Sequence, residues 1–271
     1  MYGAIIGDVA GSRFEFDRGG KTKKFQLFTN SCHFTDDTVM TVAVADGLMS
    51  ALASNEISVI KQKLCESMTL FGYMHPNAGY GAKFIYWLFD KQVPYNSFGN
   101  GSAMRVSSVG WLYDSLEETR KIARATSEIS HNHPEGIKGA DCTASVIYLG
   151  RTGATKEEIR EFVEKEFDYD LSESLDELRQ RHEHVETCMD SMPKALVSFF
   201  EGNNYEEVIR NAISLGGDTD TLGAIAGGMA EGMYEIPTDM IRDCKTFLTR
   251  DLEEVADEFY NLISNKTGKT K

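Results

Sequence analysis

Apolar residues recur along most of this chain at the three- and four-residue spacing of amphipathic helices. Residues 35–52 are a clear case, with an apolar face made of Val39, Val42, Ala43, Ala45 and Leu48. Thr35 stands before this segment as a candidate N-cap, and two acids follow it in the first turn. Similar spacing recurs over residues 56–74, 118–130, 135–150, 186–200, 204–215 and 241–263. The pattern predicts a predominantly helical protein.

Alternating strand patterns are scarce, and the best candidate, residues 23–29, is short. The 271 residues are 41% hydrophobic, enough to bury a substantial core, and no linker, repeat or low-complexity tract divides them. We therefore expect an all-α fold and one domain over residues 1–271.

The segment over residues 211–237 is rich in glycine and poor in polar side chains other than its acids and threonines. Its later glycines fall at helical spacings of four and five, at positions Gly223, Gly227, Gly228 and Gly232. Glycine lets neighbouring backbones approach closely, at a cost of about 1 kcal/mol per residue relative to alanine. Glu231 and the short length disfavour a membrane helix, so a buried central helix is predicted.

Composition narrows the function classes. A net charge of −14 disfavours nonspecific binding to nucleic acid, because the phosphate backbone would be repelled, and it suits a protein that holds divalent cations. Five cysteines without a CxxC pair support neither a disulfide framework nor a cysteine zinc site. The residues after Met1 lack the basic start and the long apolar core typical of a signal peptide, and no run of about 18 apolar residues occurs. We expect a cytoplasmic monomer without membrane association.

Two acid–threonine clusters, "FTDDT" at residues 34–38 and "GGDTDT" at residues 216–221, each precede an apolar helix. Helix capping explains either cluster taken alone. If the two helices begin side by side, however, their carboxylates converge and repel unless a cation neutralises them. Oxygen ligands without histidine or thiolate favour Mg²⁺, Mn²⁺ or Ca²⁺. Four or five carboxylates suit two ions, which can orient a diol or phosphate and activate water.

Five longer motifs carry a family resemblance: "GAIIGDVAGSRFEF", "FTDDTVMTVAVADGL", "GNGSAMRVSSVGWLY", "SHNHPEGIKGADCTASVIYL" and "SLGGDTDTLGAIAGGMAEGMYEIP". In order and spacing, from about residue 3 to residue 237, the chain resembles the ADP-ribosylglycohydrolase family. This family includes the dinitrogenase reductase activating glycohydrolase and the eukaryotic ADP-ribosylhydrolases. The resemblance implies an all-helical orthogonal domain with two Mg²⁺ or Mn²⁺ ions at the base of a cleft, where the ribose hydroxyls next to the scissile bond bind.

The resemblance also assigns residues to the metal centre. The matching metal ligands are Thr35, Asp36, Asp37, Asp218, Asp220 and Thr221. Glu15 matches the acid near the metals and is our candidate for general acid/base or for a displaceable ligand, with Asp37 as a second catalytic candidate. Asp8 lies in what reads as a glycine-punctuated turn, "GDVAGSRFE", and is interpreted as a structural acid that accepts from backbone donors.

Substrate-binding residues follow from three further segments. The loop over residues 97–106 resembles the family segment that contacts the diphosphate and distal ribose, which implies Gly99, Asn100, Gly101 and Ser102. Gly79, Tyr80 and Gly81 are similar to a segment near the diphosphate, and an aromatic ring there can stack on adenine. His131 matches a histidine that hydrogen-bonds substrate, a better reading than zinc because no cysteine or third clear histidine is nearby.

Arg105 has two readings, as a phosphate ligand or as the anchor of a neighbouring acid. The predicted activity is metal-dependent hydrolysis of the glycosidic bond between ADP-ribose and an acceptor. The acceptor stays open among arginine, serine, a nucleobase and an acetyl ester. Three alternatives are a noncatalytic ADP-ribose-binding module, a structural protein akin to the J1-crystallins, and a different two-metal hydrolase. The complete ligand set favours the hydrolase.

Overall fold

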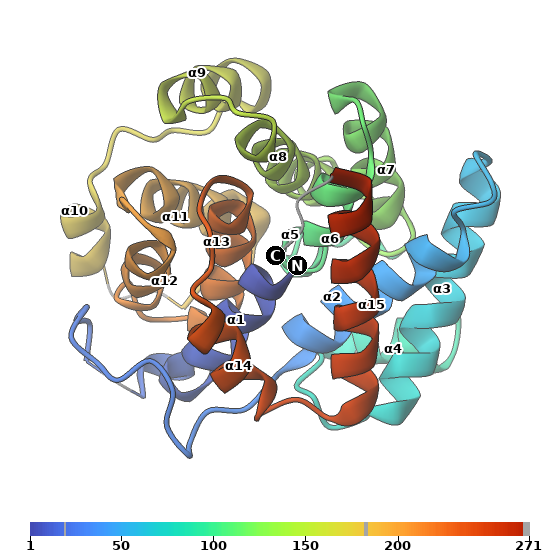
Figure 1. Cartoon of the computed structure of the whole chain (residues 1–271), viewed down its shortest axis with the longest axis horizontal. Coiled ribbons are helices and arrows are strands. Elements are labelled where there is room, and N and C mark those ends of the chain that lie inside the picture. The colour runs from blue at the N-terminus through green and yellow to red at the C-terminus, as the bar shows by residue number, and fades with distance from the viewer. Residues whose placement is uncertain (19, 182–183, 268–271) are drawn as a thin grey trace.

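The computed structural model describes residues 1–18, 20–181 and 184–267. Over these described ranges every regular secondary-structure element is a helix, so the predicted all-α fold class is confirmed (Figure 1). An isolated β-bridge joins Gly99 to Thr187.

The first half of the chain forms α1 (Tyr2–Gly11), the 3₁₀ helix η1 (Ser12–Asp17), α2 (Asp36–Ser50), α3 (Ile57–Met74), α4 (Ala82–Phe89), α5 (Gly101–Met104), α6 (Ser107–Leu112) and α7 (Leu116–Glu128). The second half forms α8 (Pro134–Arg151), α9 (Lys156–Phe167), α10 (Leu175–Gln180), α11 (Cys188–Glu201), α12 (Tyr205–Ile213), α13 (Thr219–Met233), α14 (Thr238–Lys245) and α15 (Arg250–Thr267).

The centre of the molecule is the contact between α1 and α13, which are far apart in sequence and adjacent in space (Figure 1). All residues of α13 except Glu231 and Met233 are buried, which confirms the predicted central helix. A Cβ placed on Gly7 would lie 2.0 Å from the carbonyl oxygen of Gly223. Side chains at this crossing would therefore force the helices apart, and glycine permits the backbones to touch.

The start of α2 follows the sequence prediction. Thr35 is its N-cap, and the Thr35 hydroxyl accepts a hydrogen bond of 3.3 Å from the backbone N–H of Asp37. Val39, Val42 and Leu48 are buried, and α2 packs against α3, α15 and α1. This arrangement delivers the first acid cluster close to the α1–α13 pair.

Residues 23–29, the best strand candidate in the sequence, form no strand, in keeping with the predicted all-α fold. The carbonyls of Lys23 and Phe25 instead accept hydrogen bonds from the Arg210 side chain. Two local expectations were wrong. The expected turn at "GDVAG" is the second half of α1, because its glycines serve helix packing. Residues 241–263 divide between α14 and α15.

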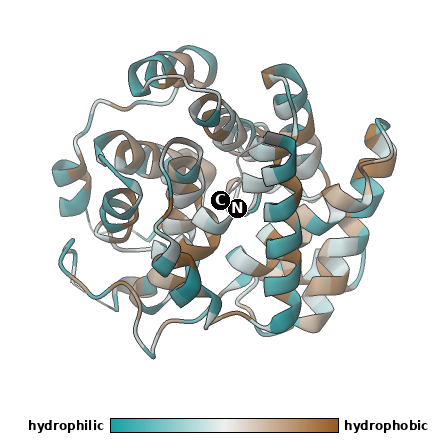
Figure 2. Cartoon of the chain, in the orientation of Figure 1, coloured by the Kyte–Doolittle hydropathy of each residue, from teal (hydrophilic) through white to brown (hydrophobic). Residues whose placement is uncertain are grey.

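The outer helices carry the polar surface. Figure 2 shows hydrophilic residues along α9, α10 and α15, whereas the buried apolar residues gather between the inner helices. Among the described residues, no helix has both the length and the apolar character needed to cross a bilayer.

Candidate active site

Four segments bring their carboxylates together: α1, η1, the start of α2 and the start of α13. Two groups of three acids result, in which one oxygen from each member lies within 4.8 Å of the others. The first group is Asp8, Asp37 and Asp220, and the second is Glu15, Asp218 and Asp220. Asp220 belongs to both, so the acids form one continuous cluster.

Asp8 anchors the beginning of α2. Its carboxylate accepts hydrogen bonds from the backbone N–H groups of Thr35 at 2.9 Å and Thr38 at 3.0 Å, and from both hydroxyls. Four donors on one buried carboxylate favour its ionised form, although burial raises its pKa. The predicted structural role, acceptance from backbone donors, is confirmed. What the sequence pattern did not indicate is its closeness to Asp37 and Asp220.

Asp37 is buried with one oxygen paired and one unpaired. Its Oδ2 accepts from the hydroxyl of Thr221 at 3.0 Å and from that of Thr35 at 3.4 Å. Its Oδ1 is enclosed and has no hydrogen-bond partner among the described residues. An unpaired buried carboxylate oxygen is costly unless it is protonated or bound to a cation. Asp37 therefore directs an unused ligand atom into the cluster.

Asp218 is the N-cap residue of α13 and is held from another element. Its Oδ2 accepts a hydrogen bond of 2.6 Å from Nδ2 of Asn100, which also donates to the hydroxyl of Ser191 at 3.0 Å. Gly216 and Gly217 precede it with φ of 75° and 74°, a left-handed backbone that glycine adopts readily. The double-glycine turn and Asn100 together fix the direction of this carboxylate.

The acids of the cluster disfavour one another's ionised forms. Burial, then neighbouring carboxylates, raise the pKa of Asp37 and Asp220 well above the ordinary range. The same causes raise the pKa of Asp36 to about 8. A divalent cation would remove both penalties, and carboxylate oxygens are the ligands that Mg²⁺ and Mn²⁺ prefer. The donor set therefore fits the predicted metals.

Asp36 lies at the outer side of the cluster, next to the loop before α4. Its backbone N–H donates to the carbonyl of Ala78 at 2.8 Å, and a Cβ on Gly79 would lie 3.4 Å from its Oδ1. Tyr80 is buried with its hydroxyl unpaired, and Asp36 contributes to raising its pKa. The Tyr80 ring is buried, and its centroid lies 6.0 Å from that of the Phe84 ring.

Glu15 lies on η1 and is half-buried. Burial and the charge of Asp218 raise its pKa, which favours the protonated form compared with an ordinary glutamate. The next residue, Phe16, has a left-handed φ of 57°, and its N–H donates to the carbonyl of Gly217 at 3.1 Å. This bond ties η1 to the turn that carries Asp218, so Glu15 reaches the cluster from its solvent side.

The glycine loop before α5 lies against His131. A Cβ would lie 3.6 Å from Nε2 of His131 if placed on Gly99, and 3.2 Å if placed on Gly101. The hydroxyl of Ser102 donates to the carbonyl of Gly136 at 2.7 Å and lies 3.5 Å from the carbonyl of Gly99 in the loop itself. The loop and the histidine thus form one unit, which Asn100 joins to the acid cluster through its hydrogen bond to Asp218.

Gly81 is exposed, and a Cβ placed on it would meet no atom within 4 Å, so its substrate-binding role stays a prediction. Arg105 is 1% exposed, and its guanidinium has no acidic partner among the described residues. It donates hydrogen bonds to the carbonyl of Thr126 and to the hydroxyl of Ser130. Neither reading of Arg105 from the sequence was right.

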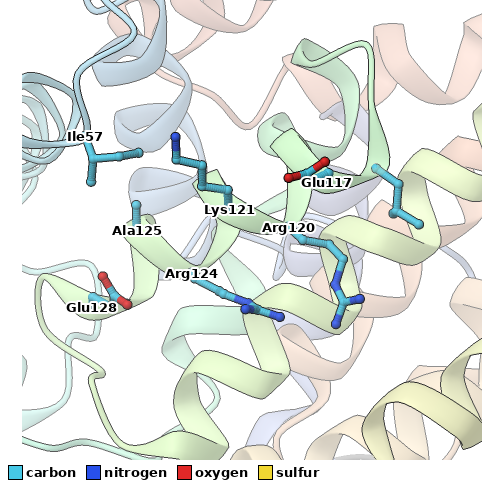
Figure 3. Close-up of a pocket in the computed structure, with 8 residues that line it drawn as sticks. Ile57, Glu117, Arg120, Lys121, Arg124, Ala125 and Glu128 are labelled. Carbon is cyan, nitrogen blue, oxygen red and sulfur yellow. The ribbon is translucent and has the colours of Figure 1, made fainter.

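A cavity of about 600 Å³ lies elsewhere, along α7 (Figure 3). Its basic side chains include Arg120 and Arg124, both of which are paired with Asp141. None of the predicted site residues lines it. The acid cluster therefore remains the candidate active site.

Comparisons with known proteins identify the family and the fold of the chain. The model of the family described as ADP-ribosylglycohydrolase matches residues 1–268. ADP-ribosylhydrolase ARH3 of Homo sapiens is 24% identical over 331 aligned positions, which cover 93% of this chain and 90% of ARH3. ARH3 of Mus musculus is 26% identical over 290 positions, with 83% and 76% covered. A solved structure of an ADP-ribosylglycohydrolase-related protein complex has the same fold, with a TM-score of 0.70, 22% identity and coverage of 96% and 95%. The chain belongs to the ADP-ribosylglycohydrolase family.

Proposed function

We propose that this protein is a metal-dependent hydrolase that cleaves the glycosidic bond between ADP-ribose and an acceptor. The observation that carries the proposal is the pair of carboxylate groups that share Asp220, together with Oδ1 of Asp37, a member of the first group, which is buried and unpaired among the described residues. A purely structural site would pair this oxygen. The names of the ARH3 relatives, ADP-ribosylhydrolases, support the substrate class.

Two Mg²⁺ or Mn²⁺ ions are the proposed cofactors. Their ligands would be Thr35, Asp36, Asp37, Asp218, Asp220 and Thr221. When bound, such ions neutralise the cluster, hold the ribose hydroxyls beside the scissile bond and lower the pKa of a coordinated water. Asn100 and Asp8 would orient these ligands. Asn100 donates a hydrogen bond to Asp218, and Asp8 accepts one from the backbone N–H of Thr35.

Glu15 is the proposed general acid/base. Its raised pKa makes a proton available closer to neutral pH, and its half-buried position allows exchange with solvent. As an acid it would protonate the leaving group, and as a base it would accept the proton of the attacking water. Asp37 is the second candidate, but its contacts with Thr35 and Thr221 commit it to the interior of the cluster.

The substrate would extend from the cluster along the glycine loop. Gly99, Gly101 and His131 present backbone and ring edges without intervening side chains, which suits a diphosphate or a ribose. Gly79 has no side chain to fill the space next to Oδ1 of Asp36. These residues would fix ADP-ribose, while the acceptor would lie outside this set.

The test follows release of ADP-ribose from arginine-, serine- and nucleobase-linked substrates and from the acetyl ester, with Mg²⁺, with Mn²⁺ and with chelator. We expect metal-dependent release from at least one substrate, lost in Asp218→Ala. Asp176→Ala is the control, because this side chain is 82% exposed and belongs to neither group of clustered acids. Release that persists in chelator and in Asp218→Ala would refute the proposal. Metal-dependent binding of ADP-ribose without cleavage would favour a binding module.

A further inference from the structure

Arg105, Ser130 and His131 form a buried hydrogen-bonded chain that ends beside the glycine loop. Nη2 of Arg105 donates to Oγ of Ser130 at 2.8 Å, and this oxygen lies 2.8 Å from Nδ1 of His131. All three side chains are buried. These three hydrogen-bonded side chains are not part of the acid cluster, and their contacts converge on the imidazole of His131.

Counting protons along the chain indicates the state of His131. An arginine can only donate, so one lone pair of Ser130 Oγ is occupied. The hydroxyl proton then needs an acceptor, and within residues 1–18, 20–181 and 184–267 the acceptor in reach is Nδ1. A protonated Nδ1 would leave this hydroxyl proton buried without an acceptor, so the contacts favour an unprotonated Nδ1 and a neutral imidazole with its proton on Nε2.

The charge of Arg105 acts in the same direction. Its guanidinium has no carboxylate partner among the described residues, and besides Ser130 it donates to the carbonyl of Thr126 at 3.1 Å. A second positive charge on the adjacent imidazole would be unfavourable. Burial and this neighbouring charge lower the pKa of His131 well below its ordinary value. An unpaired buried arginine is costly to keep, which favours a role beyond packing.

The ring is also held in place mechanically. Tyr95 and Phe84 flank it at centroid distances of 5.6 Å and 6.2 Å. The hydroxyl of Ser127 donates to the carbonyl of His131 at 2.8 Å, and the carbonyl of Ser127 accepts from the His131 N–H at 2.7 Å. Backbone and ring are therefore fixed independently, the backbone by Ser127 and the ring by Ser130 and its aromatic neighbours.

Nε2 of His131 faces the place where the glycine loop lacks side chains. It has no hydrogen-bond partner in the described part of the chain, and it lies within van der Waals range of Cβ positions that Gly99 and Gly101 leave empty. Its N–H is thus directed at the loop that the proposed substrate would occupy.

We propose that Arg105 and Ser130 are positioning residues that hold His131 as a neutral, Nε2-protonated hydrogen-bond donor for the ligand in the Gly99–Gly101 loop. The ligand atom it meets must be an acceptor, such as a diphosphate oxygen or a ribose oxygen. Resting on the proposed function, this inference specifies how one of its binding groups recognises ADP-ribose.

The first measurement is a long-range ¹H–¹⁵N spectrum of ligand-free protein with ¹⁵N-labelled histidine at neutral pH, with His131 assigned through His131→Gln. We expect Nδ1 to have the shift of an unprotonated ring nitrogen and Nε2 that of a protonated one. A protonated Nδ1, or a cationic ring, would overturn the proposal. Because no substrate is present, this result is independent of whether the protein hydrolyses anything.

The second measurement compares matched serine variants by calorimetric titration with ADP-ribose and by the same spectrum. Ser130→Ala should lose the single tautomer and weaken binding about three- to tenfold, the loss expected for one neutral hydrogen bond. Ser130→Thr should restore both, since it keeps the hydroxyl. Ser127→Ala is the control, because its buried hydroxyl contacts the His131 backbone and not the ring.

These outcomes separate the two proposals. In turnover assays Ser130→Ala should raise KM with kcat nearly unchanged, because His131 binds the part of the ligand away from the scissile bond. An unchanged spectrum and affinity in Ser130→Ala would refute the positioning role. Wild-type protein that shows the expected tautomer but releases no ADP-ribose would refute the hydrolase and leave the state of His131 established.

Discussion

Nδ2 of Asn100 donates a 2.6 Å hydrogen bond to Oδ2 of Asp218, across 118 positions of sequence. The amide belongs to the loop that the proposed substrate would contact, and the carboxylate belongs to the proposed metal centre. Ser191 accepts the second amide proton at 3.0 Å, so Asn100 cannot turn without breaking both contacts. Asn100 therefore links the loop over residues 97–106 to the acid cluster by a direct hydrogen bond.

Asn100→Ala should lower the affinity for Mn²⁺ about ten- to hundredfold, the range typical of residues that orient a metal ligand. Asp218 would lose the donor that directs it and would repel Glu15 and Asp220 more strongly. Calorimetric titration with Mn²⁺ measures the change. Ser191→Ala is the matched control and should have a smaller effect, since the amide keeps its bond to Asp218. Equal affinity in a folded Asn100→Ala variant would contradict this role.

Asp37→Asn should have opposite effects on the metal-free and metal-loaded proteins. Without metal it removes a carboxyl whose ionisation is opposed by burial and by the neighbouring carboxylates, so the melting temperature should rise. With Mn²⁺ it replaces a charged ligand by a neutral one, so the increase in melting temperature on adding metal should shrink. Thermal melts in chelator and in Mn²⁺ give both values. A variant less stable in chelator, with an undiminished response to Mn²⁺, would show that Asp37 is structural.

Glu15→Gln should reduce kcat about a hundredfold or more, as expected when a general acid/base is removed, and should change ADP-ribose affinity little. Glu186→Gln is the control: it makes the same charge change close by, since the charge of Glu186 contributes to the raised pKa of Glu15, but its own side chain is 68% exposed. Equal turnover in the Glu15 and Glu186 variants would remove Glu15 from the mechanism.

The pH dependence of stability follows from Asp36. Burial and the charge of Asp8 raise its pKa from 3.8 to about 8 in the folded protein. Between these values the unfolded chain is ionised while the folded protein retains the proton, so folding becomes less favourable as pH rises. The contribution of Asp36 to stability is fully present below pH 3.8 and is lost as pH rises through about 8.

Melting temperatures of the metal-free protein and of Asp36→Asn, compared over this interval, test the prediction. The difference between the two proteins should shift in favour of the variant as pH rises. Mn²⁺ should stabilise the wild type more at high pH than at low pH, because its ligands must be ionised. A difference that stays constant over the whole interval would contradict the assignment.

Local features of this fold were predictable from local sequence. Thr35 is expected as an N-cap because threonine before two acids and an apolar helix satisfies free backbone donors, and it is one. The glycines of α13 indicate close packing, although not the partner. Gly7 of α1 meets Gly223 at a helix crossing, whereas its local sequence predicts a turn, because glycine favours both.

Relationships between distant residues were not predictable from periodicity. The distance from Asp8 to Asp37 and Asp220 depends on how α1 crosses α13 and where α2 begins, and no spacing in the sequence encodes that crossing. Arg105 is expected to contact phosphate or an acid, because a charged side chain seldom enters a core without one. Its actual partners, Thr126 and Ser130, are neutral groups with no distinctive pattern.

The central claim is that two metal ions share one acid cluster around Asp220. Anomalous diffraction from crystals grown with Mn²⁺ tests it most directly, because manganese can be located without assuming its ligands. We predict two anomalous peaks, one contacting Asp37 and Asp220 and the other contacting Asp218 and Asp220. A single peak, or peaks that none of these carboxylates contacts, would contradict the account.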